Sequence, residues 1–310
     1  MFISVLLATH NRDSILERTL KSMLDLKMHG AEWELIVIDN AGSSVTKAIC
    51  EKFGQRLPLL YLVETKPGKN NALNRGLNYA KSDLLVFTDD DVIVEQDWLW
   101  QLYSAAQRYP DHDLFGGKVE PYFPPGVKLD ARIVIDHPVT RVAYAAVDLG
   151  QNDQPTSASS IWGPNMMVRR RVFNAGLGFD PNIGPRQSAS YIMGSEASLL
   201  LPAEKAGFKG MYVSGATVNH QIRPEQMKFE WFRARAQRMG RGKAVNSKEE
   251  IAKFKMVFGV PRFLYRKLVK LFLMKSISRV FSSKEQRFDN EMQYYSWLGF
   301  YKQYREGIPE

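Results

Sequence analysis

The chain has 310 residues, of which 45% are hydrophobic and 24% charged, and a single cysteine, Cys50. This composition excludes a disordered, fibrous or disulfide-stapled protein, because it offers enough apolar surface to bury a sizeable core. The net charge of +9 is unevenly placed: residues 221–310 hold 20 Lys and Arg against 9 Asp and Glu, which leaves 22 against 24 in residues 1–220. The positive excess is therefore entirely C-terminal.

The chain begins MFISVLLATHNR, a short apolar run with no basic segment before it and no cleavage pattern after it. We interpret it as a β-strand and not as a signal peptide. No stretch of about 18 uncharged apolar residues follows, which argues against a transmembrane helix. With a lone cysteine, we expect a cytoplasmic protein.

Strand-length apolar runs alternate with helical segments through the first third of the chain, a pattern typical of an α/β fold with parallel strands. The expected strands cover residues 2–8, 35–38, 59–63 and 84–87. Ser14 and Glu17 have the spacing of a capping box, which predicts the start of the first helix. A second helix should bury Ala72, Leu73, Leu77 and Ala80.

Polar residues follow three of these strands: residues 9–12, Asp39 with Asn40, and residues 89–91. The carboxyl ends of parallel strands share one edge of an open sheet, where ligands bind. We therefore expect the three loops to form one crevice.

The pattern loosens after Gly116, and residues 128–160 lack a clear period, which predicts a long excursion over the core. Regularity returns at residues 161–168, in a helix over 196–206, and in a strand over 211–218 that leads to His220.

Three consecutive aspartates, Asp89, Asp90 and Asp91, end the strand at 84–87. Clustered carboxylates repel one another unless a cation is present, and hard oxygen ligands suit Mg²⁺ or Mn²⁺ held together with substrate phosphates. The alternative is that these side chains only cap the following helix.

A second polar cluster, GKNNALNRG, spans residues 68–76 at a helix start, where backbone N–H groups and the helix dipole favour anions. It lacks the spacing of a Walker loop or of a dinucleotide fingerprint, so neither a P-loop NTPase nor a classical dehydrogenase is indicated. An ordinary helix N-terminus is the competing interpretation.

Together, ATHNR, VIDN, GKNNALNRG and FTDDDV, followed in order by GPNMMVRR, GFDPNIGP, GSEASLLLPAEKAG and VNHQIRPE, resemble the family 2 glycosyltransferases. The resemblance covers residues 1–241. It implies a GT-A fold, in which a Rossmann-like mixed α/β sheet is flanked by helices, and inverting transfer that depends on Mn²⁺ or Mg²⁺.

The resemblance assigns roles position by position. Thr9, Asn11 and Arg12 fall in the nucleotide pocket and Asp39 near the base, while Lys69 and Asn74 flank the nucleotide. In the DxD element, Asp91 would ligate the metal and Asp89 would face ribose or metal-bound water, with Asp90 between them. His220 would approach the metal or the diphosphate, whereas a lone histidine at a strand end is otherwise more often structural.

Inverting transfer needs a general base for the attacking hydroxyl. The family usually supplies it from a Glu-Asp pair, but here Glu196 is followed by Ala197, so the base assignment is open. Glu196 is the remaining candidate, with a pKa that burial could raise. The competing interpretation is a helix-terminal residue that interacts with the dipole.

The resemblance implies that the segment Gly163, Pro164 and Asn165 approaches the acceptor and the donor sugar, and it assigns Asn165 to donor binding. The spacing alone is equally compatible with a core strand. Asp180, which precedes a proline, should organise a turn.

The C-terminal segment contains a basic amphipathic pattern. Val260, Leu264, Leu268 and Leu271 share one predicted face, while Arg262, Arg266 and Lys270 recur on another. This helix could pack its apolar face on the protein or bind an anionic membrane surface, and a nucleic-acid partner is not expected.

We therefore expect a catalytic domain over residues 1–220 and a basic, mainly helical extension over 221–310. The expected activity is transfer of a sugar from a nucleoside-diphosphate sugar to a hydroxyl of a saccharide or lipid-linked acceptor, in polysaccharide or glycolipid assembly. The expected location is cytoplasmic, with peripheral contact at the inner face of the membrane. The alternative is a noncatalytic nucleotide-sugar or nucleic-acid binding module that uses the basic tail.

Overall fold

The computed structural model describes residues 2–185, 193–247, 251 and 253–307. These residues form two compact units. The first combines residues 2–122, 145–185 and 194–221, and the second combines residues 123–144 and 193 with the described residues from 222 onward. Residues 123–144 therefore pack with the C-terminal segment, although the sequence analysis placed them within the catalytic region.

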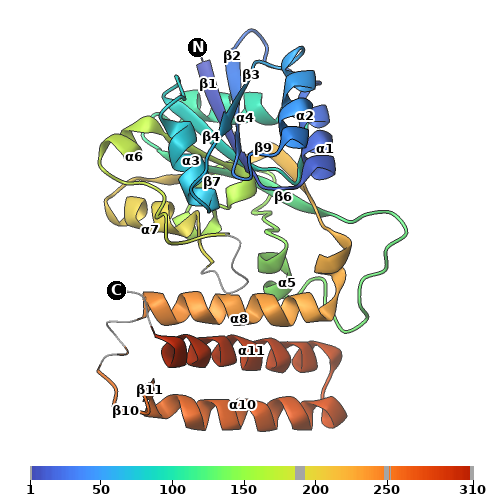
Figure 1. Cartoon of the computed structure of the whole chain (residues 1–310), viewed down its shortest axis with the longest axis vertical. Helices are drawn as coiled ribbons and strands as arrows, with labels where there is room; N and C mark the ends of the chain where they lie inside the picture. The colour runs from blue at the N-terminus through green and yellow to red at the C-terminus, as the bar shows by residue number, and fades with distance from the viewer. Residues whose placement is uncertain (1, 186–192, 248–250, 252, 308–310) are drawn as a thin grey trace. The chain divides into compact units, whose positions relative to one another are not determined.

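The first unit is built on one mixed sheet with the strand order β3-β2-β1-β4-β8-β6-β9-β5, and β7 pairs with β9 (Figure 1). The strands are β1 (Phe2–Thr9), β2 (Glu32–Asp39), β3 (Leu59–Val63), β4 (Leu84–Asp89), β5 (Val92–Val94), β6 (Leu114–Tyr122), β7 (Gln154–Thr156), β8 (Met166–Arg169) and β9 (Gly210–Gln221). The first four strands in this order are parallel, and β8 runs antiparallel to both β4 and β6. The expected mixed α/β fold is confirmed.

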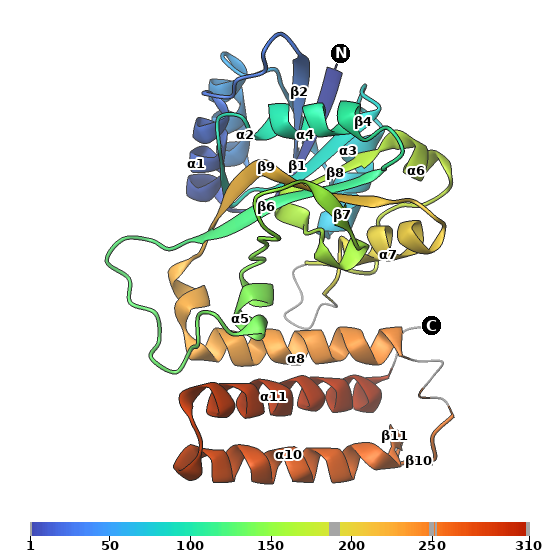
Figure 2. The same cartoon turned by 180° about the vertical axis from the view of Figure 1, so that it is seen from behind.

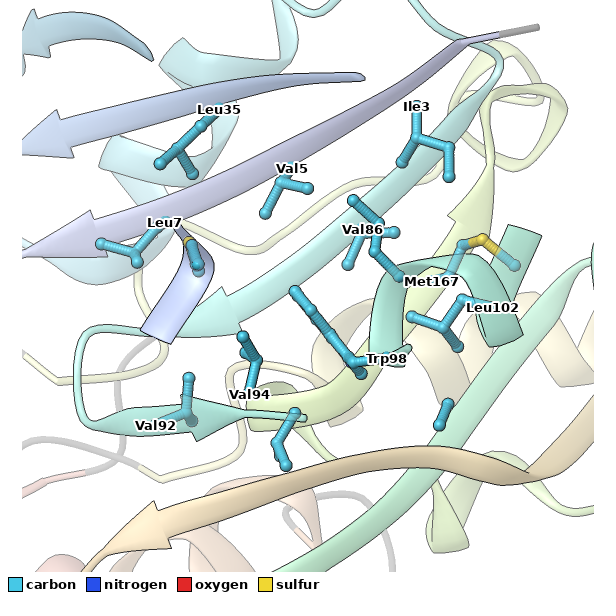
Figure 3. Close-up of a cluster of buried hydrophobic side chains, with 14 of the residues drawn as sticks. Ile3, Val5, Leu7, Leu35, Val86, Val92, Val94, Trp98, Leu102 and Met167 are labelled. Carbon is cyan, nitrogen blue, oxygen red and sulfur yellow. The ribbon is translucent and has the colours of Figure 1, made fainter. Parts of the chain in front are cut away.

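Helices cover both faces of this sheet. They are α1 (Asp13–Met23), α2 (Ser44–Gly54), α3 (Lys69–Leu77), α4 (Trp98–Arg108), α6 (Arg170–Asn174) and α7 (Ala197–Lys205). Alternate residues of β1 point to opposite faces of the sheet. Ile3, Val5 and Leu7 pack toward α1, α2 and α4. Leu6 packs toward α3 and α7. Figure 3 shows the first of these clusters, with Trp98 at its centre. Burial on both faces explains why the strands read as continuous apolar runs.

The first helix begins two residues earlier than the capping-box spacing predicted. Asp13 is its first residue and Arg12 is the N-cap, so Ser14 lies inside the first turn and the predicted capping box is wrong. The Asp13 carboxylate accepts a hydrogen bond of 2.7 Å from Thr46 Oγ1, which ties the helix start to α2. The start of α1 is thus set by a tertiary contact and not by a local cap.

Strand β6 lies where the sequence pattern loosened. Its glycines weaken that pattern, but they let its backbone approach the neighbouring strands closely. A Cβ atom on Gly117 would collide with the Ala216 carbonyl oxygen and with the Asn165 amide. The pairing of β6 with β9 also shifts register at residues 117 and 118, which marks a bulge. The two consecutive glycines that weakened the strand signal are what permits the strand to pack here.

We predict that Gly117→Ala destabilises the protein by about 2 kcal/mol or more, because neither the β9 backbone nor the enclosed Asn165 can move away without further loss. Gly54→Ala is the matched control, since a Cβ at Gly54 meets nothing within 4 Å. That change sits on a helix and should leave stability equal or slightly higher. Urea unfolding of both variants checks the difference, and equal midpoints would contradict it.

The second unit is helical, as expected for the C-terminal extension. Its helices are α5 (Pro138–Ala143), α8 (Phe229–Asn246), α10 (Arg262–Phe281) and α11 (Lys284–Glu306), with a hairpin of β10 (Met256–Val257) and β11 (Val260–Pro261). Helix α11 lies between α8 and α10 (Figures 1 and 2). Gly240 and Gly299 let α8 and α11 meet at backbone distance, because a Cβ on either would collide with the other helix.

The predicted apolar face of the basic helix is largely covered. Leu264 and Leu271 on α10 are buried, and Val260 is buried in β11. The basic residues Arg262, Arg266 and Lys270 are exposed. None of the described helices is long and apolar enough to cross a membrane.

Candidate active site

The register of the sheet gathers the predicted polar residues at one edge. Asp89 pairs with Ala8 at the end of β1, and Thr9 pairs with Asp39 at the end of β2. His220 on β9 lies opposite Val92, which directly follows the aspartates. The strand ends therefore meet as the sequence predicted, and the short strand β5 adds His220 to them.

Asp89, Asp90 and Asp91 lie at the end of β4, and we call these three residues the aspartate turn. Asp90 is buried and holds the turn in place. Its two carboxylate oxygens accept hydrogen bonds from Thr9 Oγ1 at 2.7 Å and from Arg12 Nη1 at 2.8 Å. Burial raises the pKa of Asp90, the Arg12 guanidinium opposes that rise, and Asp91 adds to it. Thr9 and Arg12, which the sequence placed in the nucleotide pocket, here hold the turn that carries the other two aspartates.

Asp91 lies between a guanidinium and an imidazole. Arg12 Nη1 is 3.1 Å from Asp91 Oδ2, and His220 Nε2 is 3.5 Å from Asp91 Oδ1. The backbone carbonyl of Asp91 accepts a bond of 2.7 Å from the Gln221 amide, which fixes the turn against β9. The carboxylate and the imidazole predicted to act together are thus brought into contact.

Asp89 pairs with Lys69, the first residue of α3. Burial works to lower the pKa of Lys69, but Asp89 and then Glu196 raise it above its ordinary value. A Cβ on Gly163 would lie 3.6 Å from Lys69 Nζ and 3.9 Å from Glu196 Oε2, so both side chains border this glycine. The structure therefore brings Glu196 and the aspartate turn to the same cation.

Glu196 stands immediately before α7, and its side chain forms no capping hydrogen bond. Its backbone carbonyl accepts the amides of Leu199 and Leu200, so the helix start holds the residue in place. Ala197, where the family usually has a second acidic residue, is the first residue of α7. Glu196 thus occupies the N-cap position of α7, and its partly exposed carboxylate makes no capping hydrogen bond and lies near the Lys69 ammonium.

Two of the three asparagines of α3, Asn70 and Asn74, bind the GFD segment at residues 178–180. Asn74 Nδ2 donates to the Phe179 carbonyl at 2.8 Å, and Asn70 Nδ2 donates to the Asp180 carbonyl at 2.7 Å. The Asn74 amide is thus engaged by the protein, and the predicted position of Asn74 beside the nucleotide stays a prediction. Asn70 was missed; it is fully buried and also accepts a hydrogen bond from Ser195 Oγ, beside Glu196.

Asp39 is fully buried and organises its own loop. Its carboxylate accepts from the amides of Ala41 and Ser43 at 2.8 Å each and from Tyr61 Oη at 2.9 Å. Asp39 is fully buried and hydrogen-bonded within the protein, and its predicted contact with a base stays a prediction. Asn40 beside it accepts from the Gly68 amide at 2.7 Å and so ties the second strand loop to the start of α3.

Asn165 is also a structural residue. It has no exposed surface, accepts from Trp98 Nε1 at 2.8 Å, and donates to the carbonyls of Lys118 and Ala216. Its amide joins three elements of the core, and the predicted role of Asn165 in donor binding stays a prediction.

Asn11, predicted to line the nucleotide pocket, and Asp180, predicted to organise a turn, both lie in loops. Asn11 is exposed and has a φ of 51°, a left-handed conformation that asparagine tolerates, and it immediately precedes Arg12. Asp180 forms the predicted turn, since its carboxylate accepts the Asn182 amide at 2.8 Å. The turn prediction for Asp180 is confirmed.

A metal would need ligands from outside the protein. Within the described ranges, no three His, Cys, Asp or Glu side chains lie close enough to hold an ion by themselves. Mg²⁺ and Mn²⁺ commonly use one or two carboxylates together with substrate phosphates. The Asp91 carboxylate with His220 beside it fits such a site, completed by a diphosphate.

Comparison with known proteins identifies the family. Residues 4–177 match the family described as Glycosyl transferase family 2, which is more than half of the chain. The chain therefore belongs to glycosyl transferase family 2.

Two relatives illustrate the range of the match. A glucosyl-dolichyl phosphate glucuronosyltransferase of Haloferax volcanii is 26% identical over 185 residues, 56% of this chain and 57% of that protein. A poly-beta-1,6-N-acetyl-D-glucosamine synthase of Staphylococcus aureus is 33% identical over 96 residues, 31% of this chain and 23% of that protein. The chain thus matches little more than half of the first relative's length and about a quarter of the second.

Solved structures agree on the fold. The mannosyltransferase PcManGT of Pyrobaculum calidifontis, in complex with GDP-Man and Mn²⁺, has a TM-score of 0.60 at 16% identity, with 97% of this chain and 86% of that chain covered. Residues 1–349 of S. aureus TarS give a TM-score of 0.51 at 15% identity, covering 98% and 89%. These likenesses establish the GT-A fold.

We predict that Arg12→Met destabilises the protein by about 2 kcal/mol at neutral pH, because two buried carboxylates lose their shared cation. The expected loss is moderate because the Arg12 side chain is 37% exposed. The already raised pKa of Asp90 should rise further in the variant, so its folded state binds more protons than its unfolded state. Stability should therefore fall as pH rises between the unfolded and folded pKa values of Asp90, and the deficit should shrink in acid.

Arg18→Met is the control, because Arg18 is exposed on the same helix. Thermal unfolding of both variants from mildly acidic to neutral pH measures the effect. A deficit for Arg12→Met that is the same at every pH would contradict the assignment of Arg12 as the cation of the aspartate turn.

Proposed function

We propose that the protein is an inverting glycosyltransferase that moves a sugar from a nucleoside-diphosphate donor to the hydroxyl of a saccharide or lipid-linked acceptor. The observation that carries the proposal is the meeting of the aspartate turn, Lys69, Glu196 and His220 at one sheet edge in a family 2 chain. The neighbours bound to GDP-Man with Mn²⁺ and to UDP support a nucleotide-sugar donor.

In this proposal the first compact unit performs the chemistry, and its cations receive the diphosphate. Arg12 and Lys69 supply positive charge on either side of the aspartate turn, and the exposed Asn11 borders the same loop. Asp39, Asn40 and Gly68 shape the pocket through their loops. Asp89 is held by Lys69 and faces the donor as the outer carboxylate of the turn.

Asp91 and His220 would hold a divalent cation, Mn²⁺ or Mg²⁺, which when bound neutralises the charge on the departing diphosphate. The donor set supports this assignment, since Asp91 Oδ1 and His220 Nε2 lie 3.5 Å apart at the end of β9.

Glu196 is the proposed general base. Its carboxylate accepts the proton of the acceptor hydroxyl as that oxygen attacks the anomeric carbon, and the bond from that carbon to the phosphate oxygen breaks on the opposite face. The nearby ammonium of Lys69 orients the carboxylate, and both side chains border Gly163, in the segment proposed to approach the acceptor. Inversion at the anomeric carbon follows from a single displacement.

We also propose that the acceptor is presented at an anionic lipid surface, which the second unit contacts. The support is the basic excess of residues 221–310 and the exposure of Arg262, Arg266 and Lys270 on α10.

Donor identity can be tested by thermal shift with GDP, UDP and other nucleoside diphosphates in the presence of Mn²⁺, because ligands that bind the folded state raise its apparent stability. We predict that one nucleotide raises the unfolding temperature of the protein and that Asp91→Asn abolishes the Mn²⁺-dependent part. Asp91→Asn should also lower hydrolysis of the matching nucleotide sugar about a hundredfold or more. Tight polynucleotide binding without turnover would instead indicate a noncatalytic module.

We predict that Glu196→Gln lowers kcat for transfer by about 10²- to 10⁴-fold with little change in donor affinity, because only proton removal from the acceptor is lost. Glu204→Gln on the same helix is the control; its Oε1 accepts the Ala158 amide, a bond that glutamine can keep. Steady-state kinetics with the acceptor measure both variants. Retained turnover in Glu196→Gln would remove this residue as the base.

A further inference from the structure

Exposed apolar side chains are concentrated in one short segment of the second unit. Of the eighteen large hydrophobic residues that are exposed in the described chain, ten lie between residues 254 and 281. Elsewhere such residues are scattered, which is ordinary for a protein surface. A concentrated apolar surface on a folded protein usually marks a contact with another body.

Helix α10 is apolar on two sides. Leu264 and Leu271 are buried on the side that packs against α11. A second stripe, formed by Val269, Leu273, Ile277 and Val280, has helical spacing and exposed fractions of 62%, 53%, 59% and 74%. We call these four residues the outer face of α10. Packing within the unit leaves this face uncovered, and a shallow hollow runs along it from Tyr265 to Ile277.

The hairpin before α10 displays one more apolar side chain. Phe258 is 84% exposed and has a φ of 49°, followed by Gly259 with a φ of 75°. A left-handed backbone is rare for a bulky residue and costs free energy, and such strain clusters at functional positions. The hairpin leads through Pro261 directly into α10, so β10 and β11 lie beside the start of the helix (Figure 2).

The charge of α10 indicates which kind of partner its outer face binds. The helix carries six Lys and Arg and no Asp or Glu. Arg262, Arg266 and Lys270 are exposed near the outer face, so cations accompany the apolar stripe. A second copy of α10 placed on this face would bring like charges together, whereas anionic lipid headgroups would complement them.

We propose that the outer face of α10, together with the Phe258 tip, inserts shallowly into an anionic lipid surface with the helix axis in the membrane plane. A helix of this length covers about 30 Å of that surface. The stripe would enter the boundary between headgroups and acyl chains while the basic side chains reach the phosphates. This inference rests on the proposed lipid contact but not on the chemistry of sugar transfer.

Flotation of the full chain with vesicles of phosphatidylcholine and roughly one-third phosphatidylglycerol tests the proposal. The wild type should float, and Leu273→Gln/Ile277→Gln/Val280→Gln should lower its partition coefficient at least about tenfold at low and high salt, since three apolar side chains are lost. The control Val45→Gln/Leu201→Gln changes residues that are 55% and 46% exposed in the first unit and should bind as the wild type does. A wild type that fails to float, or a triple variant that floats equally, would overturn the proposal.

The charged contribution is separated by Arg262→Gln/Arg266→Gln/Lys270→Gln. This variant should bind at low salt about as weakly as the wild type binds at high salt, because screening removes the same attraction. Full retention of salt-sensitive binding would contradict the role of these cations.

A site-specific readout uses the lone cysteine. Cys50 is buried, and burial raises the pKa of its thiol to about 12, so it should resist labelling in the folded protein. A polarity-sensitive dye on Ile277→Cys should shift its emission to the blue when anionic vesicles are added, and the same dye on Val45→Cys should not. Equal emission with and without vesicles at Ile277→Cys would exclude insertion.

Sedimentation without vesicles tests whether a second copy covers the face. A wild-type dimer that becomes monomeric in the triple variant would overturn the lipid assignment. Hydrolysis of the nucleotide sugar by the triple variant, measured without lipid, should equal that of the wild type. Loss of flotation with full hydrolysis therefore supports the proposal, while absent hydrolysis in both proteins would count against the proposed transferase activity alone.

Discussion

The pairing of Arg12 with Asp90 and Asp91 is the constraint on which the candidate site depends. Three consecutive carboxylates follow a buried strand, and their mutual repulsion grows as solvent is excluded. Arg12 pairs with two of these carboxylates and Lys69 pairs with the third. The loop after β1 and the start of α3 must therefore meet at the end of β4. Asn11 in its left-handed conformation turns the chain just before Arg12. The loop after β1 is therefore shaped by the charge that it must neutralise.

Lys69 links the donor side and the acceptor side of the proposed reaction. Lys69 contacts Asp89 and lies near Glu196, so the carboxylate proposed to take the acceptor proton and the turn proposed to face the donor share one positive charge. Asn70 supports this arrangement from behind, since it binds both the Asp180 carbonyl and Ser195, the residue before Glu196. A preformed arrangement of this kind needs little reorganisation when charge moves during transfer.

The sequence identified the strands, the edge where they end and the family, because apolar runs and ordered motifs are local signals. It did not identify which way a polar side chain turns. Asp39, Asn74 and Asn165 lie in the predicted loops, yet their hydrogen bonds are made to the protein. Asn70 is the residue that the same motif could have revealed, but only the docking of the GFD segment distinguishes it from its neighbours. Strand β6 was missed because the glycines that permit its close packing also weaken the strand pattern.

The sequence does not show which C-terminal cations and apolar side chains are used inside the second unit. Part of the basic excess is used inside the second unit: Arg233 pairs with Glu291, Arg241 pairs with Glu306, and the Lys275 ammonium lies 4.1 Å from the ring centroid of Tyr294. Periodicity found the stripe of α10 that contains Leu264 and Leu271, which α11 covers. The opposite stripe is also apolar, and only the position of α11, which follows α10 in the chain, decides which of the two stripes faces solvent. The cations that remain outward lie beside that uncovered stripe, so charge and apolar surface act together on one side of one helix.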